Sequence, residues 1–220
     1  HKGRYEGHDY LFPANVDVFG IWYNKKMFRE RGWTPPQTYE DLLELSPKIR
    51  EAGIAPLTFT GRYPSYPLLG VLVPLMISAE GIEGYIAINN LEPGAWKKPG
   101  FLRAARAIME LKHKGYFQGG CIGMNHTESQ MEFLVERVAM IPCGTWLHSE
   151  MKNLLPADFE IEFMRPFVFA DGIGEPTAIR AGLNGKGWFI PAKGNHPDVA
   201  ADFFRYLSSP AKQKEFVETK

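Results

Sequence analysis

The sequence predicts a mixed α/β protein in which helices cover a sheet. Two observations support this fold class: short apolar runs recur along the chain, and longer segments with a helical period separate them. The apolar runs, which we expect to form strands, are residues 18–23 (VFGIWY), 55–60 (APLTFT), 138–143 (VAMIPC), 159–164 (FEIEFM) and 188–192 (WFIPA). The composition, with 45% apolar and 23% charged residues, is that of an ordinary globular protein with a proper core.

The clearest helix signal lies at residues 38–53 (TYEDLLELSPKIREAG). Thr38 and Asp41 have the spacing of a capping box at the start, and Gly53 is a typical stop. Pro47 lies inside this segment and lacks the N–H that a helix interior needs, so we expect a kink or a break there.

Further helices are expected where similar signals occur. Residues 101–115 form an amphipathic pattern whose predicted stripe contains Phe101, Ala105, Ile108, Met109 and Lys112. Residues 127–137 begin with Thr127 and Gln130 at capping-box spacing. The other helical segments are 24–33, 196–209 with Pro197 in its first turn, and 209–216 with Pro210 in its first turn. Glycine-rich residues 171–187 lack a hydrophobic period and predict a loop or hinge.

Charge and cysteine content narrow the classes of partner. Lys and Arg number 25 and so do Asp and Glu, which argues against nucleic acid or an anionic membrane as the main partner. The two cysteines, Cys121 and Cys143, have no zinc-ligand spacing. They form either a disulfide in an oxidising compartment or two buried thiols, and the sequence leaves both open.

The sequence contains neither an apolar run of about 18 residues nor a signal peptide. It begins with HKGRYEGHDYLFP, which is unlike a natural amino terminus. We therefore expect it to be a piece of a longer protein.

Catalytic motifs are absent from the sequence: there is no nucleophile elbow, phosphate loop, HExxH pair or dinucleotide fingerprint. No cofactor, no metal and no enzymatic activity are expected. Glu160 and Glu162 share one face of a predicted strand and resemble a glycosidase pair, but carboxylates so placed are more often simply the solvated face. His148 could face a cleft, and a surface or capping role is favoured.

Three aromatic residues stand beside glycines at the ends of predicted elements: Tyr63, Trp146 and Trp188. Side chains at strand ends of an α/β sheet project into the crevice where ligands bind. A flat ring there can stack on the apolar face of a pyranose, while acids and amides bond its hydroxyl groups. The alternative is that each ring covers the core beneath its own loop, and both interpretations stay open.

The stretch AMIPCGTW, residues 139–146, is the most informative of the three. An apolar run ends at Gly144, and a tryptophan comes directly after this turn. We interpret Gly144 as removing a side chain that would block a guest from the Trp146 ring.

The order of several segments resembles that of family 1 extracellular solute-binding proteins, which include the maltose-binding protein. The segments are YNK at 23–25 with its adjoining helix, TPPQTYEDLLEL at 34–45, ERVAMIPCGTW at 136–146 and GWFIPAKGNHPDVAADFFRYLSSPAKQKEF at 187–216. Each is weak alone and together they are specific. The resemblance covers nearly the whole chain.

The resemblance implies an α/β fold of the type II periplasmic-binding-protein-like class with two lobes. Residues 1–13 would end the amino-terminal lobe, 14–187 would form the carboxyl-terminal lobe, and 188–220 would return to the amino-terminal lobe. The two crossings would fall near residues 13–20 and 187–191. The first part of the amino-terminal lobe would lie outside the sequence.

It also implies which residues bind ligand in an interlobe cleft. Trp146 matches the family's stacking residue, Tyr63 a cleft tyrosine, and Asp17 a hinge acid that contacts sugar hydroxyls. Arg62 stands where the maltose-binding relative has no charge, so it adds a donor, selects an acidic sugar, or pairs at the surface. The full expected set is Asp17, Arg62, Tyr63, Gly144, Trp146, Gly187 and Trp188. Trp22 is expected to pack beside the hinge strand.

The partners that the resemblance implies are a mono- or oligosaccharide and the membrane permease subunits of an ABC importer. The protein would be a monomer at the periplasm or cell surface, with a lipoprotein anchor as one option. Two alternatives remain. A carbohydrate-active hydrolase or lyase would need an acid/base pair, for which Asp17 is the one cleft candidate. A binding protein for a peptide, polyamine or metal would need clustered ligands or more cleft acids.

Overall fold

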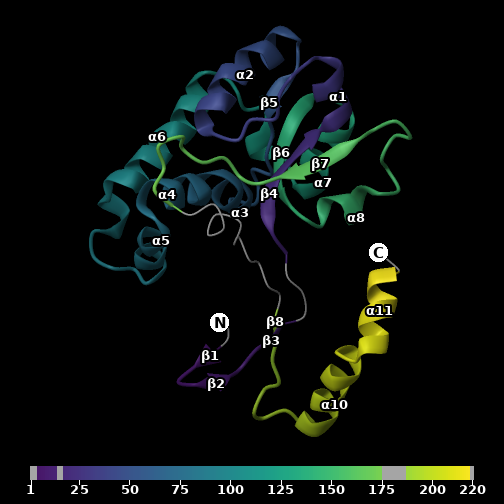
Figure 1. The fold of residues 1–220 in the computed structure, drawn as a ribbon. Helices are drawn as coiled ribbons and strands as arrows, with labels where there is room; N and C mark the ends of the chain where they lie inside the picture. The colour runs from purple at the N-terminus through teal and green to yellow at the C-terminus, as the bar shows by residue number, and fades with distance from the viewer. Residues whose placement is uncertain (1–3, 14–16, 175–186, 219–220) are drawn as a thin grey trace. The chain divides into compact units, whose positions relative to one another are not determined.

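The computed structural model describes residues 4–13, 17–174 and 187–218, and its chain divides into two compact units (Figure 1). Unit 1 combines His1–Asp17 with Asn184–Lys220, and unit 2 is the single stretch Val18–Leu183. Unit 2 holds the larger sheet and both clusters of the hydrophobic core.

The sheet of unit 2 has four strands in the order β5-β6-β4-β7. They are β4 (Phe19–Asn24), β5 (Ala55–Leu57), β6 (Val138–Gly144) and β7 (Ile161–Met164). β4 runs antiparallel to β6 and β7, and β5 runs parallel to β6. All six residues of β4 are buried, as its unbroken apolar run predicts for a strand covered on both faces. These four strands were predicted, although β5 and β7 are shorter than their apolar runs.

Helices cover both faces of this sheet (Figure 1). Ile21 and Tyr23 point into the larger core cluster, which they share with α2, α4 and α6, whereas Trp22 points into a second cluster with α7 and α8. Trp22 is thus a residue of β4 itself, and its expected place beside a hinge strand stays a prediction. The helices are α1 (Lys25–Glu30), α2 (Tyr39–Glu51), α3 (Ser65–Pro67), η1 (Leu68–Leu72), α4 (Val73–Glu80), α5 (Ile82–Asn89), η2 (Ala95–Lys97), α6 (Pro99–His113), η3 (Cys121–Gly123), α7 (His126–Leu134) and α8 (Leu147–Met151).

The start and stop of α2 agree with prediction, and its interior does not. Thr38 and Asp41 form the capping box, and Gly53 comes after the helix with φ +78°. The expected break at Pro47 is wrong, because α2 continues through it to Glu51. Pro47 lies on the exposed side of the helix, where water can bond the backbone carbonyl that the missing N–H leaves unpaired.

Two other helix predictions are corrected. The capping box of α7 is formed by Asn125 and Glu128, not by Thr127 and Gln130. The Asn125 carboxamide accepts from the Glu128 N–H at 2.9 Å, and the Glu128 carboxylate accepts from the Asn125 N–H at 2.7 Å. This pair therefore makes both bonds of the box.

The buried face of α6 also differs from the predicted stripe. Its buried residues are Gly100, Ala104, Ala107 and Leu111, while Met109 is 44% exposed. Small residues let α6 pack closely on α4: a side-chain carbon at Gly100 would overlap Glu80, whose carboxylate accepts from the Gly100 N–H at 2.5 Å.

Unit 1 contains a hairpin, a strand pair and two helices. β1 (Arg4–Tyr5) pairs with β2 (His8–Asp9), and β3 (Phe12–Pro13) pairs antiparallel with β8 (Gly187–Trp188). The strand expected over 188–192 is therefore only two residues long and starts one residue earlier. α10 (Pro197–Leu207) and α11 (Pro210–Glu218) begin at the two predicted prolines. Most of the predicted loop at 171–187 lies outside the described residues.

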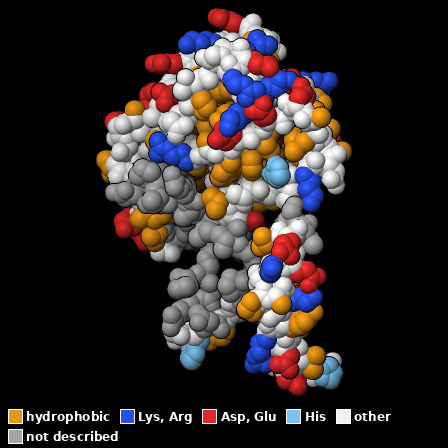
Figure 2. Space-filling model, turned by 45° about the vertical axis from the view of Figure 1, so that its right-hand side comes forward, with side chains coloured by type: hydrophobic (Ala, Val, Ile, Leu, Met, Phe, Trp, Pro, Cys, Tyr) orange, Lys and Arg blue, Asp and Glu red, His pale blue; other side chains and the backbone are white. Residues whose placement is uncertain are grey.

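The helices of unit 1 keep apolar side chains on their surface (Figure 2). Within the described residues neither α10 nor α11 has a buried residue. The exposed apolar side chains are Val199, Phe203, Tyr206, Phe216 and Val217.

The cysteine alternative is decided in favour of thiols: Cys121 and Cys143 are both free and buried. Among the described residues no single helix is long and apolar enough to cross a membrane. One bent helix pair, Ser65–Glu80 with Ile82–Asn89, passes that test together, and α4 within it contributes Leu75, Met76 and Ile77 to the core.

Candidate functional site

The first residue of β4 and the last residue of β6 meet at one edge of the sheet. Phe19 is paired with Gly144 across the two strands. Just beyond them, the Thr145 N–H donates to the Val18 carbonyl at 3.0 Å, and the Val18 N–H donates to Thr145 Oγ1 at 3.4 Å. This edge is also where the chain enters unit 2 from Asp17, so the residues around it stand beside a crossing of the chain.

An aromatic cluster of Phe19, Tyr66, Trp146 and His126 covers this edge. The Trp146 ring stands edge-on to Phe19, with centroids 5.0 Å apart, and edge-on to Tyr66, with centroids 6.1 Å apart. Tyr66 also meets the His126 ring at 5.2 Å. These near-perpendicular contacts orient the half-buried Trp146 ring within the cluster.

Gly144 is needed for the position of the indole itself. A side-chain carbon at residue 144 would overlap the six-membered ring of Trp146. The Gly144 carbonyl also accepts a hydrogen bond from Trp22 Nε1 at 2.9 Å, which holds the backbone at this position. We expected the missing side chain of Gly144 to leave room for a ligand. In the structure it leaves room for the Trp146 ring.

A polar network of His126, Gln130 and Glu150 adjoins the cluster through the His126 ring. His126 Nε2 lies 2.6 Å from Glu150 Oε2, and Gln130 Nε2 donates to the same oxygen at 3.0 Å. These contacts tie α7 to α8, the helix that begins directly after Trp146. Burial raises the pKa of the Tyr66 hydroxyl above its ordinary value, so this phenol stays protonated at neutral pH.

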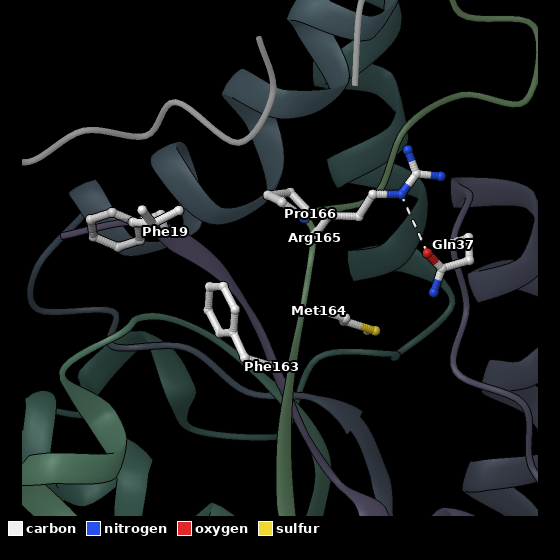
Figure 3. A pocket seen from close by; sticks show the side chains of 7 residues that line it. Phe19, Gln37, Phe163, Met164, Arg165 and Pro166 are labelled. Carbon is white, nitrogen blue, oxygen red and sulfur yellow. Dashed lines mark hydrogen bonds between the residues drawn. The ribbon is translucent and has the colours of Figure 1, made fainter. Parts of the chain in front are cut away.

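A cavity of about 490 Å³ opens at the same sheet edge, on the β7 side of Phe19 (Figure 3). It is lined by Val18, Phe19, Gln37, Phe163, Met164, Arg165 and Pro166. Arg165 Nε donates to Gln37 Oε1 at 3.3 Å, and Figure 3 shows this pair on the side away from Phe19 and Phe163. The cavity thus combines an apolar wall with an amide and a guanidinium group.

The predicted site residues fall in three places, and none of the seven lines this cavity. Gly144 and Trp146 contact each other at the sheet edge. Arg62 and Tyr63 are exposed on the loop before α3, where the Arg62 N–H donates to the Met124 carbonyl at 3.1 Å.

The other three predicted residues belong to unit 1. Asp17 ends its first segment and is partly buried. Gly187 and Trp188 form β8, and the 40%-exposed Trp188 packs on Phe204 with centroids 5.3 Å apart. Their part in a ligand site stays a prediction.

Sequence reasoning missed the side chains that orient Trp146 and those that line the cavity. Tyr66 was visible, since it lies three residues after Tyr63 in the same proline-rich stretch. Phe19 was not predictable from the alternation of β4, which groups it with Ile21 and Tyr23, because its ring contacts Tyr66 and Trp146, which pack against the cluster of Trp22. Arg165 and Gln37 come together only through the fold, 128 residues apart in sequence.

The carboxylates that resembled a glycosidase pair are engaged elsewhere. Arg29 donates to both oxygens of Glu160, at 2.6 and 2.7 Å, and this lowers the pKa of that carboxyl. Glu162 accepts from the Tyr23 hydroxyl at 2.7 Å and pairs with Lys25 at 3.1 Å. Both carboxylates are exposed or partly exposed and ion-paired, which fits a solvated strand face.

Two further features concern the described residues. His148 is exposed on α8. Within the described ranges no cluster of three or more His, Cys, Asp or Glu side chains could hold a metal ion.

Residues 2–214 match the family of bacterial extracellular solute-binding proteins. Because this match covers nearly the whole chain, the chain belongs to that family. Its members are binding proteins that act outside the bacterial cytoplasm.

Individual relatives agree with this assignment. A diacetylchitobiose-binding protein of Streptomyces coelicolor is 28% identical over 208 residues, covering 93% of this chain and 44% of that protein. A multiple sugar-binding protein of Streptococcus mutans is 24% identical over 221 residues, covering 95% of this chain and 49% of that protein. The chain therefore spans about half the length of the curated relatives it matches.

The fold is shared with solved structures. A chitin oligosaccharide binding protein superimposes with a TM-score of 0.77 at 24% identity, covering 97% of this chain and 53% of that structure. This likeness confirms the expected α/β fold of the type II periplasmic-binding-protein-like class.

Proposed function

We propose that the full protein is the extracytoplasmic solute-binding component of an ABC importer and that its ligand is a carbohydrate. The observation that carries the proposal is the half-buried Trp146 ring, whose plane is set by near-perpendicular contacts with Phe19 and Tyr66 at the end of the strands where unit 2 begins. A ring fixed in this way presents a rigid apolar surface at low entropic cost, which suits the apolar face of a pyranose. The family membership and the sugar-binding relatives support the same ligand class.

Among carbohydrates, we favour an oligosaccharide over a single sugar. The two curated relatives that cover nearly the whole chain are named for diacetylchitobiose and for multiple sugars. Arg62, Tyr63, Asp17, Gly187 and Trp188 remain proposed contacts beyond Trp146, with the arginine and the aspartate as partners for hydroxyl groups.

The lobes are assigned in the same proposal. Unit 2 corresponds to the expected carboxyl-terminal lobe of residues 14–187, and unit 1 to segments of the amino-terminal lobe. The exposed apolar side chains of α10 and α11 fit this assignment, because further residues of that lobe would cover them. The protein would work as a monomer at the periplasm or cell surface and deliver its ligand to permease subunits.

Binding without turnover is favoured over catalysis. A hydrolase or lyase would need two titratable groups converging on the ligand. The one carboxylate pair that resembled such a device is occupied by Arg29, Tyr23 and Lys25.

Calorimetric titration of the full-length protein tests the proposal. Cellobiose, maltose, raffinose and N,N′-diacetylchitobiose serve as ligands, and chromatography of each sugar after long incubation tests for turnover. We expect saturable one-site binding of at least one oligosaccharide with no new products. Absence of binding to the whole panel, or the appearance of cleavage products, would contradict the proposal.

A further inference from the structure

The cavity beside Phe19 has two chemically different walls. One wall is apolar and comes from Phe19, Phe163 and Pro166, of which Phe19 and Pro166 are buried. The other wall carries the polar ends of Arg165 and Gln37 (Figure 3). A ligand group with an oxygen acceptor at one end and a methyl group at the other would find a partner on each wall.

Arg165 is poised to donate. It is partly buried, and its Nε is occupied by the neutral carbonyl of Gln37. No carboxylate of the described residues forms an ion pair with it, in contrast to Arg29, Arg103 and Arg137. A guanidinium has five N–H donors in a rigid fork, so the outer nitrogens of Arg165 retain donors for an oxygen from a ligand.

Phe19 links this cavity to the proposed sugar platform. Its ring belongs to the aromatic cluster, 5.0 Å from Trp146, and the same residue lines the cavity. A saccharide at the Trp146 ring would therefore have the cavity on the far side of Phe19 along the same sheet edge.

We infer that this cavity is a subsite for an acetamido substituent of the saccharide, and that Arg165 determines this specificity. The acetamido carbonyl accepts from the Arg165 guanidinium, and the methyl group packs on Phe163 and Pro166. A carboxylate would also accept from this guanidinium. However, it has no methyl group to pack on the apolar wall, and its charge costs more free energy to desolvate. This inference rests on the proposed carbohydrate binding and adds the ligand's substituent.

Two matched disaccharides test the inference on the full-length protein. N,N′-diacetylchitobiose and cellobiose have the same linkage and differ in having an acetamido group or a hydroxyl at carbon 2. Each is titrated calorimetrically against wild type, Arg165→Met and Arg106→Met. Methionine keeps the length of the arginine stem, and Arg106 is an exposed arginine on α6 away from the cavity, which makes it the control.

We expect wild type to prefer diacetylchitobiose and Arg165→Met to lose about tenfold or more of that affinity while its cellobiose affinity is unchanged. Arg106→Met should behave as wild type. A second variant, Gln37→Glu, places a carboxylate against Arg165 and should also remove the preference, which keeps the test valid if Arg165→Met folds poorly.

The failures are distinguishable. Wild type that binds none of the sugars overturns the proposed function, and this inference with it. Wild type that binds both sugars equally, or an Arg165→Met variant that weakens both alike, overturns the inference alone. Cellobiouronic acid is titrated as a third ligand: if it binds more tightly than diacetylchitobiose and Arg165→Met abolishes that advantage, the subsite is for a carboxylate and the acetamido assignment is wrong.

Discussion

The six-membered ring of Trp146 occupies the space that a side chain at Gly144 would fill. The two residues are separated by Thr145 alone, so the end of β6 and the orientation of the indole are one local arrangement. Any β-carbon at 144 must move either the ring or the strand end that pairs with Phe19.

Gly144→Ala should displace the indole and act on binding as the loss of Trp146 does. We expect a stability cost of about 1–3 kcal/mol from overpacking and a fall of about tenfold in affinity for the saccharide that the full-length protein binds. Gly123→Ala is the control, because a β-carbon there has open space. A double-mutant cycle with Trp146→Ala decides the mechanism: if the two losses add in full, Gly144 acts on binding independently of the ring.

Trp146→Ala should weaken saccharide binding by about tenfold or more, since stacking and aromatic burial are lost together. The fold should persist, because Trp146 is only partly buried and Phe19 and Tyr66 remain in contact with each other at 5.6 Å. Calorimetry gives the dissociation constant and circular dichroism the fold. An unchanged dissociation constant would remove Trp146 from the site.

Gly61→Ala should move the loop that carries Arg62 and Tyr63. A β-carbon at 61 would overlap the backbone of Ile122, and the Gly61 N–H donates to the Cys121 carbonyl at 3.0 Å. The backbone of Ile122 cannot shift aside as the end of a flexible side chain can. We therefore expect the variant to lose about 1–3 kcal/mol of unfolding free energy. Gly119→Ala, with open space around its β-carbon, is the control in the same denaturant titration. Equal midpoints for the two variants would show that the two loops are not in close contact.

Both thiols should be inert in the folded protein. Burial raises the pKa of Cys143 to about 12 and also raises the pKa of Cys121, so the reactive thiolate is disfavoured at pH 8 and the sulfur is covered. With Ellman's reagent we expect no reaction for native protein and two thiols per chain after unfolding without reductant. Unfolded, unreduced protein without reactive thiols would instead reveal a disulfide between Cys121 and Cys143.

Local signals in the sequence predicted the elements well, and errors arose where tertiary contacts chose between local options. The capping box of Thr38 and Asp41 was predictable because it stands directly before the apolar period of α2. At α7 two overlapping patterns were possible, and Asn125 is the N-cap because its reciprocal bonds with Glu128 start the helix at His126. In α6 the periodicity of large residues pointed to Met109, whereas close packing on α4 selected Gly100 and the alanines.

The candidate site was predictable in part for the same reason. Trp146 and Gly144 are neighbours in sequence, so their relation was visible there. Phe19 and Arg165 join the site through the antiparallel pairings of β4 with β6 and β7, which bring together segments more than a hundred residues apart. No local pattern specifies which loops these pairings place at one sheet edge.

The division of the chain has a consequence for its synthesis on the ribosome. The four described strands of the larger sheet lie within the unbroken stretch 18–183, so they have their partners before residues 184–220 are translated. Unit 1 differs, because Phe12 waits for Trp188 and Pro13 for Gly187 across the whole of that stretch. The nascent chain can therefore complete the sheet of unit 2 first, and Phe12 and Pro13 find their β-partners only after residues 187 and 188 have been translated.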